Sequence, residues 1–115
     1  PAMDCLFCKI INREIPADIV YEDDDVLAFN DINPQAPTHQ LVIPKRHIPT
    51  LNDIAEQDLA LIGRLQYTAA TLARQAGFAD EGYRVVMNCN ERGGQTVYHV
   101  HMHLMGGRDF TWPAG

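Results

Sequence analysis

The stretch "YHVHMHLMGG", residues 98–107, places three of the chain's five histidines at alternate positions. Successive side chains of a β-strand point to opposite faces, so His99, His101 and His103 are predicted to share one face, with neighbours roughly 6–7 Å apart. The apolar residues between them take the other face, which is suited to a core. We therefore predict a strand that packs Val100, Met102 and Leu104 inward and displays its imidazoles.

Two glycine pairs flank this stretch, at residues 93–94 and 106–107. Glycine lets a ligand approach the backbone closely and leaves N–H groups free to bind phosphate oxygens. We therefore expect the histidines to lie beside an anion-binding loop.

The segments around the histidines predict an α+β fold. Residues 4–16 are expected to form a short helix or turn ended by Pro16, and the acidic run "YEDDDV" supplies the turn of a hairpin. Pro44 ends an apolar, branched run that is suited to a buried strand. The predicted strands of an antiparallel five-stranded sheet are residues 18–23, 26–31, 39–45, 83–90 and 96–105.

One long helix is predicted over residues 53–76, because its apolar residues recur at three- and four-residue steps. Asp53 and Glu56 resemble a capping box, and Gly77 is placed to close the helix. The apolar stripe consists of Leu59, Ile62, Leu65, Ala69, Leu72 and Ala76.

Length and charge exclude several classes of protein. A chain of 115 residues is expected to form a single domain over residues 3–115, with Pro1 and Ala2 a tag remnant. A net charge of −6 argues against a nucleic-acid polymer as partner. No stretch approaches the about 18 apolar residues of a membrane span, and no signal peptide is apparent. We expect a soluble, cytoplasmic protein without membrane partners, whose three cysteines are reduced thiols.

The motif "HVHMHLM" resembles the His-x-His-x-His-x-x signature of the histidine triad superfamily, in which x is apolar. The agreement extends upstream through "GYRVVMN" and "GGQTVYHVHMH". The segment from Cys8 to Thr50, which contains "DINPQAPTH", and the ending "GGRDFTWPAG" resemble the Hint branch of histidine triad nucleotide-binding proteins. The resemblance covers almost the whole chain and implies a sheet continued across a homodimer.

This resemblance implies hydrolysis of purine nucleoside 5'-phosphoramidates. A neutral imidazole is a good nucleophile near pH 7, so His101 is the implied nucleophile that forms a covalent nucleotidyl-histidine, which water then cleaves. His103 would orient His101 and hold charge on the phosphoryl oxygens together with backbone N–H groups near Gly94. Gln95 and Thr96 match the family's contacts to phosphate and the departing amine, and Asn88 matches its active-site asparagine. Serine is commoner than threonine at position 96 in the family, but the hydroxyl is kept.

The nucleoside end of the site is also implied by the resemblance. Asp31 matches the ribose-binding aspartate of the family, and Asn30 stands where the family often has histidine. In the Hint branch the tail that carries Trp112 reaches the active site of the partner subunit. The implied base pocket consists of Leu6, Phe7, Ile10, Phe29 and Ile32, each of which taken alone would more often be core.

Three other functions remain open at this point. Other superfamily branches hydrolyse dinucleoside polyphosphates or transfer nucleotides, although they usually replace the third histidine by glutamine, and His103 is kept here. The second alternative is a nucleotide-binding scaffold with incidental hydrolysis. The third is a hydrolytic zinc enzyme that uses all three histidines as ligands, which would leave Asp31, Gln95 and Thr96 without roles.

The pair of cysteines in "DCLFCK" has its own alternatives. Two reduced thiols or a redox pair are possible, and the pair lacks a second half with zinc-finger spacing. Some bacterial Hint-branch members combine this pair with the histidine of "PKRHIP" and the first triad histidine to hold structural zinc. The resemblance therefore implies a zinc site at Cys5, Cys8, His47 and His99, with zinc not required for the chemistry.

Overall fold

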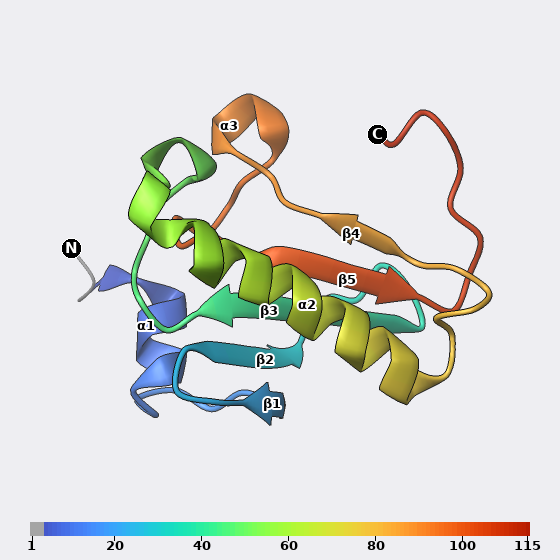
Figure 1. Cartoon of the computed structure of the whole chain (residues 1–115), viewed down its shortest axis with the longest axis horizontal. Helices are drawn as coiled ribbons and strands as arrows, with labels where there is room; N and C mark the ends of the chain where they lie inside the picture. Colours follow the sequence, from blue (N-terminus) through green and yellow to red (C-terminus); the bar gives the residue numbers. More distant parts are fainter. Residues whose placement is uncertain (1–3) are drawn as a thin grey trace.

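The computed structural model describes residues 4–115, and the predictions for Pro1, Ala2 and Met3 fall outside this range. The described residues form a five-stranded antiparallel sheet in the order β1-β2-β3-β5-β4 (Figure 1). The predicted α+β class and antiparallel sheet are confirmed. The strands are β1 (Ile19–Glu22), β2 (Val26–Asn30), β3 (Thr38–Pro44), β4 (Arg84–Val86) and β5 (Met102–Gly106).

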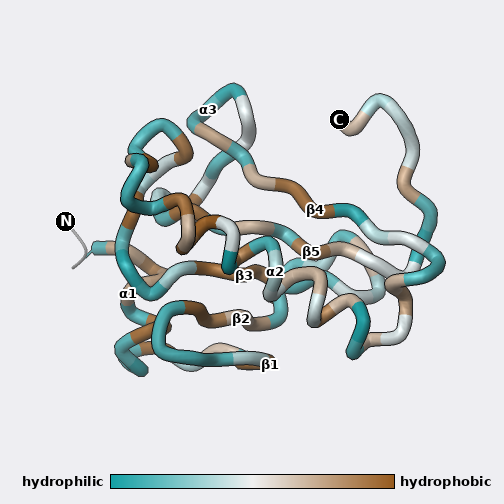
Figure 2. The backbone as a smooth tube through the Cα atoms, in the orientation of Figure 1, coloured by the Kyte–Doolittle hydropathy of each residue, from teal (hydrophilic) through white to brown (hydrophobic). Residues whose placement is uncertain are grey.

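Two helices cover opposite faces of this sheet. The long helix α2 (Leu59–Ala76) lies across one face and packs on β2, β3 and β5 through residues such as Leu65 and Leu72. The short helix α1 (Leu6–Ile11) packs Phe7 and Ile10 against the other face of β2 and β3. β2 and the second half of β3 are covered on both faces, so their residues are apolar without alternation, as Figure 2 shows for β2.

The long helix begins later than its apolar pattern predicts. Residues 51–58 form two 3₁₀ turns, η2 (Leu51–Asp53) and η3 (Glu56–Asp58), before α2 starts. The predicted capping box of Asp53 and Glu56 is wrong, because Asp53 instead accepts from the backbone N–H of Thr50 over 3.1 Å. Gly77 closes the helix as predicted, with φ +89°. Among the described helices, none is long and apolar enough to cross a membrane.

The last strand is also shorter than predicted. β5 begins at Met102, and residues 97–99 bend toward it, so His99 and His101 precede the strand. The two-sided alternation nevertheless persists, since Val100, Met102 and Leu104 are buried. The imidazoles are not displayed to solvent, because His99 is 0% and His101 is 6% exposed. They face the side of the sheet that α1 covers.

The flanking glycines serve packing and turns. A Cβ on Gly106 would lie 2.5 Å from the ring of Phe78, and Gly107 has φ +93°. Gly93 ends the short helix α3 (Asn90–Gly93), and Gly94 closes it with φ +89°. The N–H of Gly94 donates to Glu91, so the prediction that this group is free for phosphate is wrong. These glycines are explained by the fold itself.

Candidate functional site

An apolar cavity of ≈ 430 Å³ lies beside the last two triad histidines. It collects the predicted site residues Leu6, Phe7, Ile10, Phe29, Asp31, Ile32, Thr96, His101 and His103. Ile15, Pro16, Ala17, Asn30, Leu41 and Val97 also line it and were not predicted, apart from the remark on Asn30. Helix α1, the segment before β1, the end of β2 and the approach to β5 therefore meet at one cavity.

The hydrogen bonds of His101 determine which of its ring nitrogens is free. Its Nδ1 donates to the carbonyl oxygen of His99 over 2.8 Å. Burial lowers the pKa of His101, so the ring is neutral near pH 7. In a neutral imidazole only one nitrogen carries hydrogen, and Nε2 therefore keeps its lone pair. His101 contributes an unprotonated nitrogen to the site.

His103 has the opposite arrangement because of His39, a residue that sequence reasoning missed. The backbone N–H of Gln35 donates to Nδ1 of His39 over 3.0 Å, so the hydrogen of His39 sits on Nε2. This Nε2 lies 2.9 Å from Nδ1 of His103 and donates to it. Burial, with smaller contributions from the neighbouring His101 and His39, lowers the pKa of His103 to about 4. The neutral His103 ring therefore carries its hydrogen on Nε2.

The two histidines thus differ in chemistry although both line the cavity. His101 has an electron pair to donate, whereas His103 has an N–H to donate to an oxygen. Their ring centroids are 5.0 Å apart. A nucleophile and a hydrogen-bond donor side by side fit attack on a phosphoryl group whose oxygens gain charge.

Asp31 provides a fixed carboxylate at the same cavity. Its Oδ1 accepts from the backbone N–H of Asn33 over 2.9 Å, and its Oδ2 lies 3.4 Å from Nε2 of His39. Asn30 is turned to another partner, since its Nδ2 donates to Asp18 over 2.6 Å. The carboxylate of Asp31 is therefore the charged acceptor in this lining.

Four predicted substrate contacts lie outside the lining of this cavity, as far as residues 4–115 show: Asn88, Gly94, Gln95 and Trp112. The amide of Gln95 is used by the protein, since it donates to the carbonyls of Pro49 and Val97 and accepts from the N–H of Asn90. This amide fastens the loop around α3, and the contact of Gln95 to phosphate stays a prediction. Trp112 is 84% exposed in the tail.

A second cluster lies at the N-terminus of α1. The ligand atoms of Cys5, Cys8, His47 and His99 all lie within 4.8 Å of one another. Nδ1 of His99 is 3.4 Å from Sγ of Cys5 and 3.6 Å from Sγ of Cys8, and the two histidine Nδ1 atoms are 3.2 Å apart. Tetrahedral zinc would separate sulfur and nitrogen ligands by about 3.6 Å and two nitrogen ligands by about 3.3 Å. The four residues therefore fit zinc.

The tautomer of His99 also suits a cation. Nε2 of His99 donates to the carbonyl of Pro44 over 2.7 Å, which leaves a lone pair on the Nδ1 that faces the cysteines. Burial lowers the pKa of His99 to about 4, so the ring is neutral. Burial, with Cys5 beside it, raises the pKa of the Cys8 thiol to about 11. A thiolate at this depth requires a positive charge among the ligands.

The ligand atoms of Asp31, His39 and His103 also lie within 4.8 Å of one another. Here the geometry argues against a metal, because the hydrogen of His39 fills the 2.9 Å gap to His103. Two nitrogen ligands of one zinc ion would be about 3.3 Å apart. His39 and His103 are joined by a hydrogen bond, and the carboxylate of Asp31 lies beside them.

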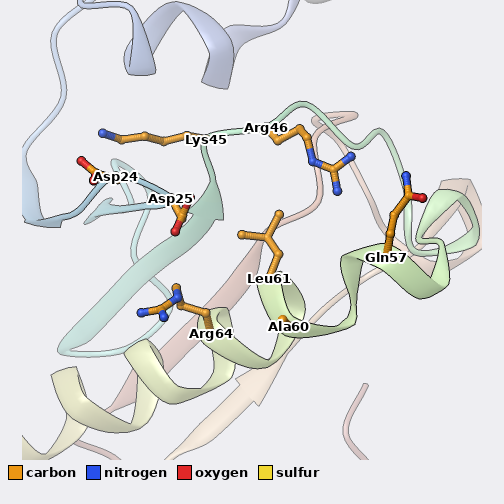
Figure 3. A pocket seen from close by; sticks show the side chains of 8 residues that line it. All are labelled: Asp24, Asp25, Lys45, Arg46, Gln57, Ala60, Leu61 and Arg64. Atoms are coloured by element: carbon orange, nitrogen blue, oxygen red, sulfur yellow. The ribbon is translucent and has the colours of Figure 1, made fainter.

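A larger cleft of ≈ 660 Å³ lies near the β1–β2 turn and the start of α2 (Figure 3). Two of its cations are neutralised, since Lys45 pairs with Glu22 over 2.8 Å and Arg46 pairs with the buried Asp58. Its lining contains neither histidine nor cysteine: Asp24, Asp25, Lys45, Arg46, Gln57, Ala60, Leu61 and Arg64. The reactive groups gather at the smaller cavity.

An α+β fold whose antiparallel sheet carries histidines at alternate sequence positions, beside an apolar cavity, defines the histidine triad class of proteins. The chain belongs to this family, because the HIT domain model matches residues 12–110. It is 57% identical over 107 residues to the purine nucleoside phosphoramidase of Escherichia coli, a match that covers 93% of this chain and 90% of the relative. It is 56% identical to an uncharacterised HIT-like protein of Synechococcus elongatus, with 97% of each chain covered.

Solved structures agree with this assignment. A HIT family hydrolase of Legionella pneumophila superposes with a TM-score of 0.96 at 54% identity, covering 97% of this chain and 100% of that one. A histidine triad nucleotide-binding protein of Candida albicans gives a TM-score of 0.83 at 33% identity, over 97% and 85% of the chains. These matches support classing the chain as a hydrolase.

Proposed function

We propose that this protein hydrolyses the P–N bond of purine nucleoside 5'-phosphoramidates through a covalent nucleotidyl-His101. The observation that carries the proposal is the pair of fixed imidazoles, one with a free lone pair at His101 and one with a free N–H at His103. The identity to the E. coli phosphoramidase supports the class of substrate.

The reaction has two steps. Nε2 of His101 forms a bond to the α-phosphorus while the P–N bond breaks, and the amine leaves with the bonding electrons and takes up a proton. Nε2–H of His103 stabilises the charge on the phosphoryl oxygens. Thr96, which lines the same cavity, is assigned to the departing amine in this proposal. Water then cleaves the nucleotidyl-histidine, releases the nucleotide and returns the lone pair to His101.

The nucleoside occupies the apolar part of the cavity. Leu6 is 47% exposed and Ile32 is fully exposed although both are large and apolar. Apolar side chains exposed at the mouth of a cavity suit a flat aromatic base that covers them. Asp31 supplies the acceptor for the ribose hydroxyls.

Turnover of adenosine 5'-phosphoramidate tests this proposal. We expect release of AMP, and alkaline quenching, which preserves a histidine phosphoramidate, should trap adenylate on the peptide that contains His101. Lack of hydrolysis together with cleavage of a dinucleoside polyphosphate would instead favour the other superfamily activity. Activity that vanishes at once with a chelator while the fold persists would favour catalytic zinc.

We further propose that Cys5, Cys8, His47 and His99 hold a structural zinc ion. Bound there, zinc supplies a cross-link, because its four ligands come from α1, the loop after β3 and the approach to β5. Supporting this assignment, His101 and His103 hydrogen-bond elsewhere and are not needed as ligands. A thiolate site of this kind and three free cysteines fit a reducing cytoplasm.

His39 is expected to be a positioning residue for the reaction. Replacing it with phenylalanine removes the N–H that fixes His103, so kcat should fall by about 10² while KM changes little. His39→Gln is the matched conservative variant, because its amide can donate to Nδ1 of His103 and should restore part of kcat. Equal losses in both variants, or a change in KM alone, would contradict this role.

We also propose that the protein is a homodimer whose sheet continues across the interface. Supporting this, β4 is an edge strand of the described sheet, and Trp112 projects 84% exposed from the tail. Sedimentation at micromolar concentration should give twice the chain mass. Truncation before Gly107 is expected to change selectivity for the departing amine more than for the base, and a monomeric species would refute the arrangement.

A further inference from the structure

Helix α1 belongs to both the cysteine cluster and the nucleotide cavity. Cys5 is its N-cap and Cys8 lies in its first turn, with the Cys8 N–H 3.4 Å from Sγ of Cys5. From the same six-residue helix, Leu6, Phe7 and Ile10 line the cavity. A displacement of one end of α1 therefore also moves a wall of the cavity.

Two direct contacts connect the cluster with the reactive histidines. The Phe7 ring packs edge to face on His101 with centroids 5.1 Å apart, and on the cluster residue His99 at 5.9 Å. The carbonyl of His99 also accepts the hydrogen bond that sets the His101 ring. The position of Phe7 and the orientation of His101 consequently depend on an intact cluster.

Part of the cluster lines an opening that adjoins the nucleotide cavity. A third, open cavity of ≈ 590 Å³ is lined by Cys5 and His47, and it shares Leu6, Thr96 and Val97 with the nucleotide cavity. Cys5 is 8% exposed and lines this opening. This opening is the route by which a small polar oxidant such as hydrogen peroxide would reach Cys5.

We propose that Cys5 and Cys8 are a peroxide-sensitive modification site whose oxidation to a disulfide releases the metal and weakens nucleotide binding. This inference rests on the zinc site and the nucleotide cavity proposed above. The Cys5 thiolate attacks one oxygen of hydrogen peroxide, the O–O bond breaks, and a sulfenic acid and hydroxide form. The Cys8 thiolate attacks the sulfenic sulfur, which forms the disulfide and expels a second hydroxide.

The sum is two thiolates and one peroxide giving one disulfide and two hydroxides, with sulfur oxidised and peroxide oxygen reduced. Only His47 and His99 then remain as ligands, and two ligands do not retain structural zinc. The disulfide imposes its own geometry on the backbone at the start of α1. The side chains of Leu6 and Phe7 are thereby displaced from the cavity wall. We expect the affinity for AMP to fall by at least about tenfold, which corresponds to one lost apolar contact.

The test uses zinc-loaded Cys89→Ser protein, in which the third thiol is removed and the cluster is intact. After hydrogen peroxide, three quantities are measured: zinc released to a chromogenic chelator, the Cys5–Cys8 disulfide by peptide mass spectrometry, and AMP affinity by calorimetry. We expect zinc release and disulfide formation in parallel with weaker AMP binding. Dithiothreitol with added zinc should restore the affinity.

Cys8→Ser in the same background lacks the resolving thiol and should form no disulfide; because it also removes a zinc ligand, it is the control for disulfide formation alone. Zinc release without a change in AMP affinity would overturn the coupling, and thiols that stay reduced in peroxide would overturn the modification. Absence of zinc in an active protein would remove this inference and the zinc site but not the hydrolase. Absence of AMP binding before oxidation would instead count against the proposed function.

Discussion

Replacing His101 with alanine is expected to lower turnover of adenosine 5'-phosphoramidate by at least about 10⁴-fold, because it removes the atom that bonds to phosphorus. AMP affinity should stay largely unchanged, since Asp31 and the apolar lining supply the nucleoside contacts. Steady-state turnover and calorimetric binding are measured on the same preparation. Retained turnover would disprove the covalent mechanism.

His101 is buried, so the alanine variant also leaves a void beside Phe7. His101→Asn is the matched control, because its amide fills part of that space and can donate to the His99 carbonyl without providing a nucleophile. It should be as inactive as the alanine variant. His103→Ala is expected to slow the reaction by only about 10²–10³-fold, because it removes a donor to the phosphoryl oxygens.

Loss of the cysteine cluster is expected to produce the largest change in stability. Purified protein should contain about one zinc ion per chain, and Cys8→Ser should lower Tm by more than about 10 °C, because the cross-link between three segments is lost. Chelation should lower Tm before it lowers turnover at saturating substrate, since zinc takes no part in the bond changes. Elemental analysis and thermal melts of the same samples measure both effects.

Cys89→Ser is the control for the loss of a thiol, because Cys89 lies outside the cluster. Its Tm should change little, and it should keep its zinc. Zinc well below one ion per chain in protein purified without chelator, or a Cys5→Ser/Cys8→Ser protein with unchanged Tm, would contradict the site.

Local patterns predict most of the secondary structure of this chain. The acidic turn predicts the β1–β2 hairpin, and the apolar steps from Leu59 to Ala76 predict α2. The start of α2 could not be predicted. Asp53 was expected to cap this helix, but its carboxylate accepts a hydrogen bond from the N–H of Thr50 instead. The local hydrogen bond between Thr50 and Asp53 competes with helix formation there. Which of the two forms depends on the residues before and after this segment.

The candidate site likewise has features that local sequence patterns predict and features that they do not. The alternation of His99, His101 and His103 predicts that they share a face, and all three do lie on the side of the sheet that α1 covers. The burial of His99 and His101 could not be predicted from it, because α1 comes from about 90 positions earlier in the sequence. The hydrogen bond of Gln95 to Pro49 could not be predicted for a similar reason, since Pro49 lies 46 positions away along the chain.

The sequence by itself determined the strand alternation, the long amphipathic helix and the resemblance of the triad to a known family, because these depend on spacing along the chain. Tertiary structure alone decided the chemistry of each imidazole. His39 meets His103 across 64 residues because β3 pairs with β5, and Pro44 meets His99 across 55. A ring nitrogen keeps or loses its hydrogen according to the partner that faces it, and those partners come from segments that only the folded sheet brings together.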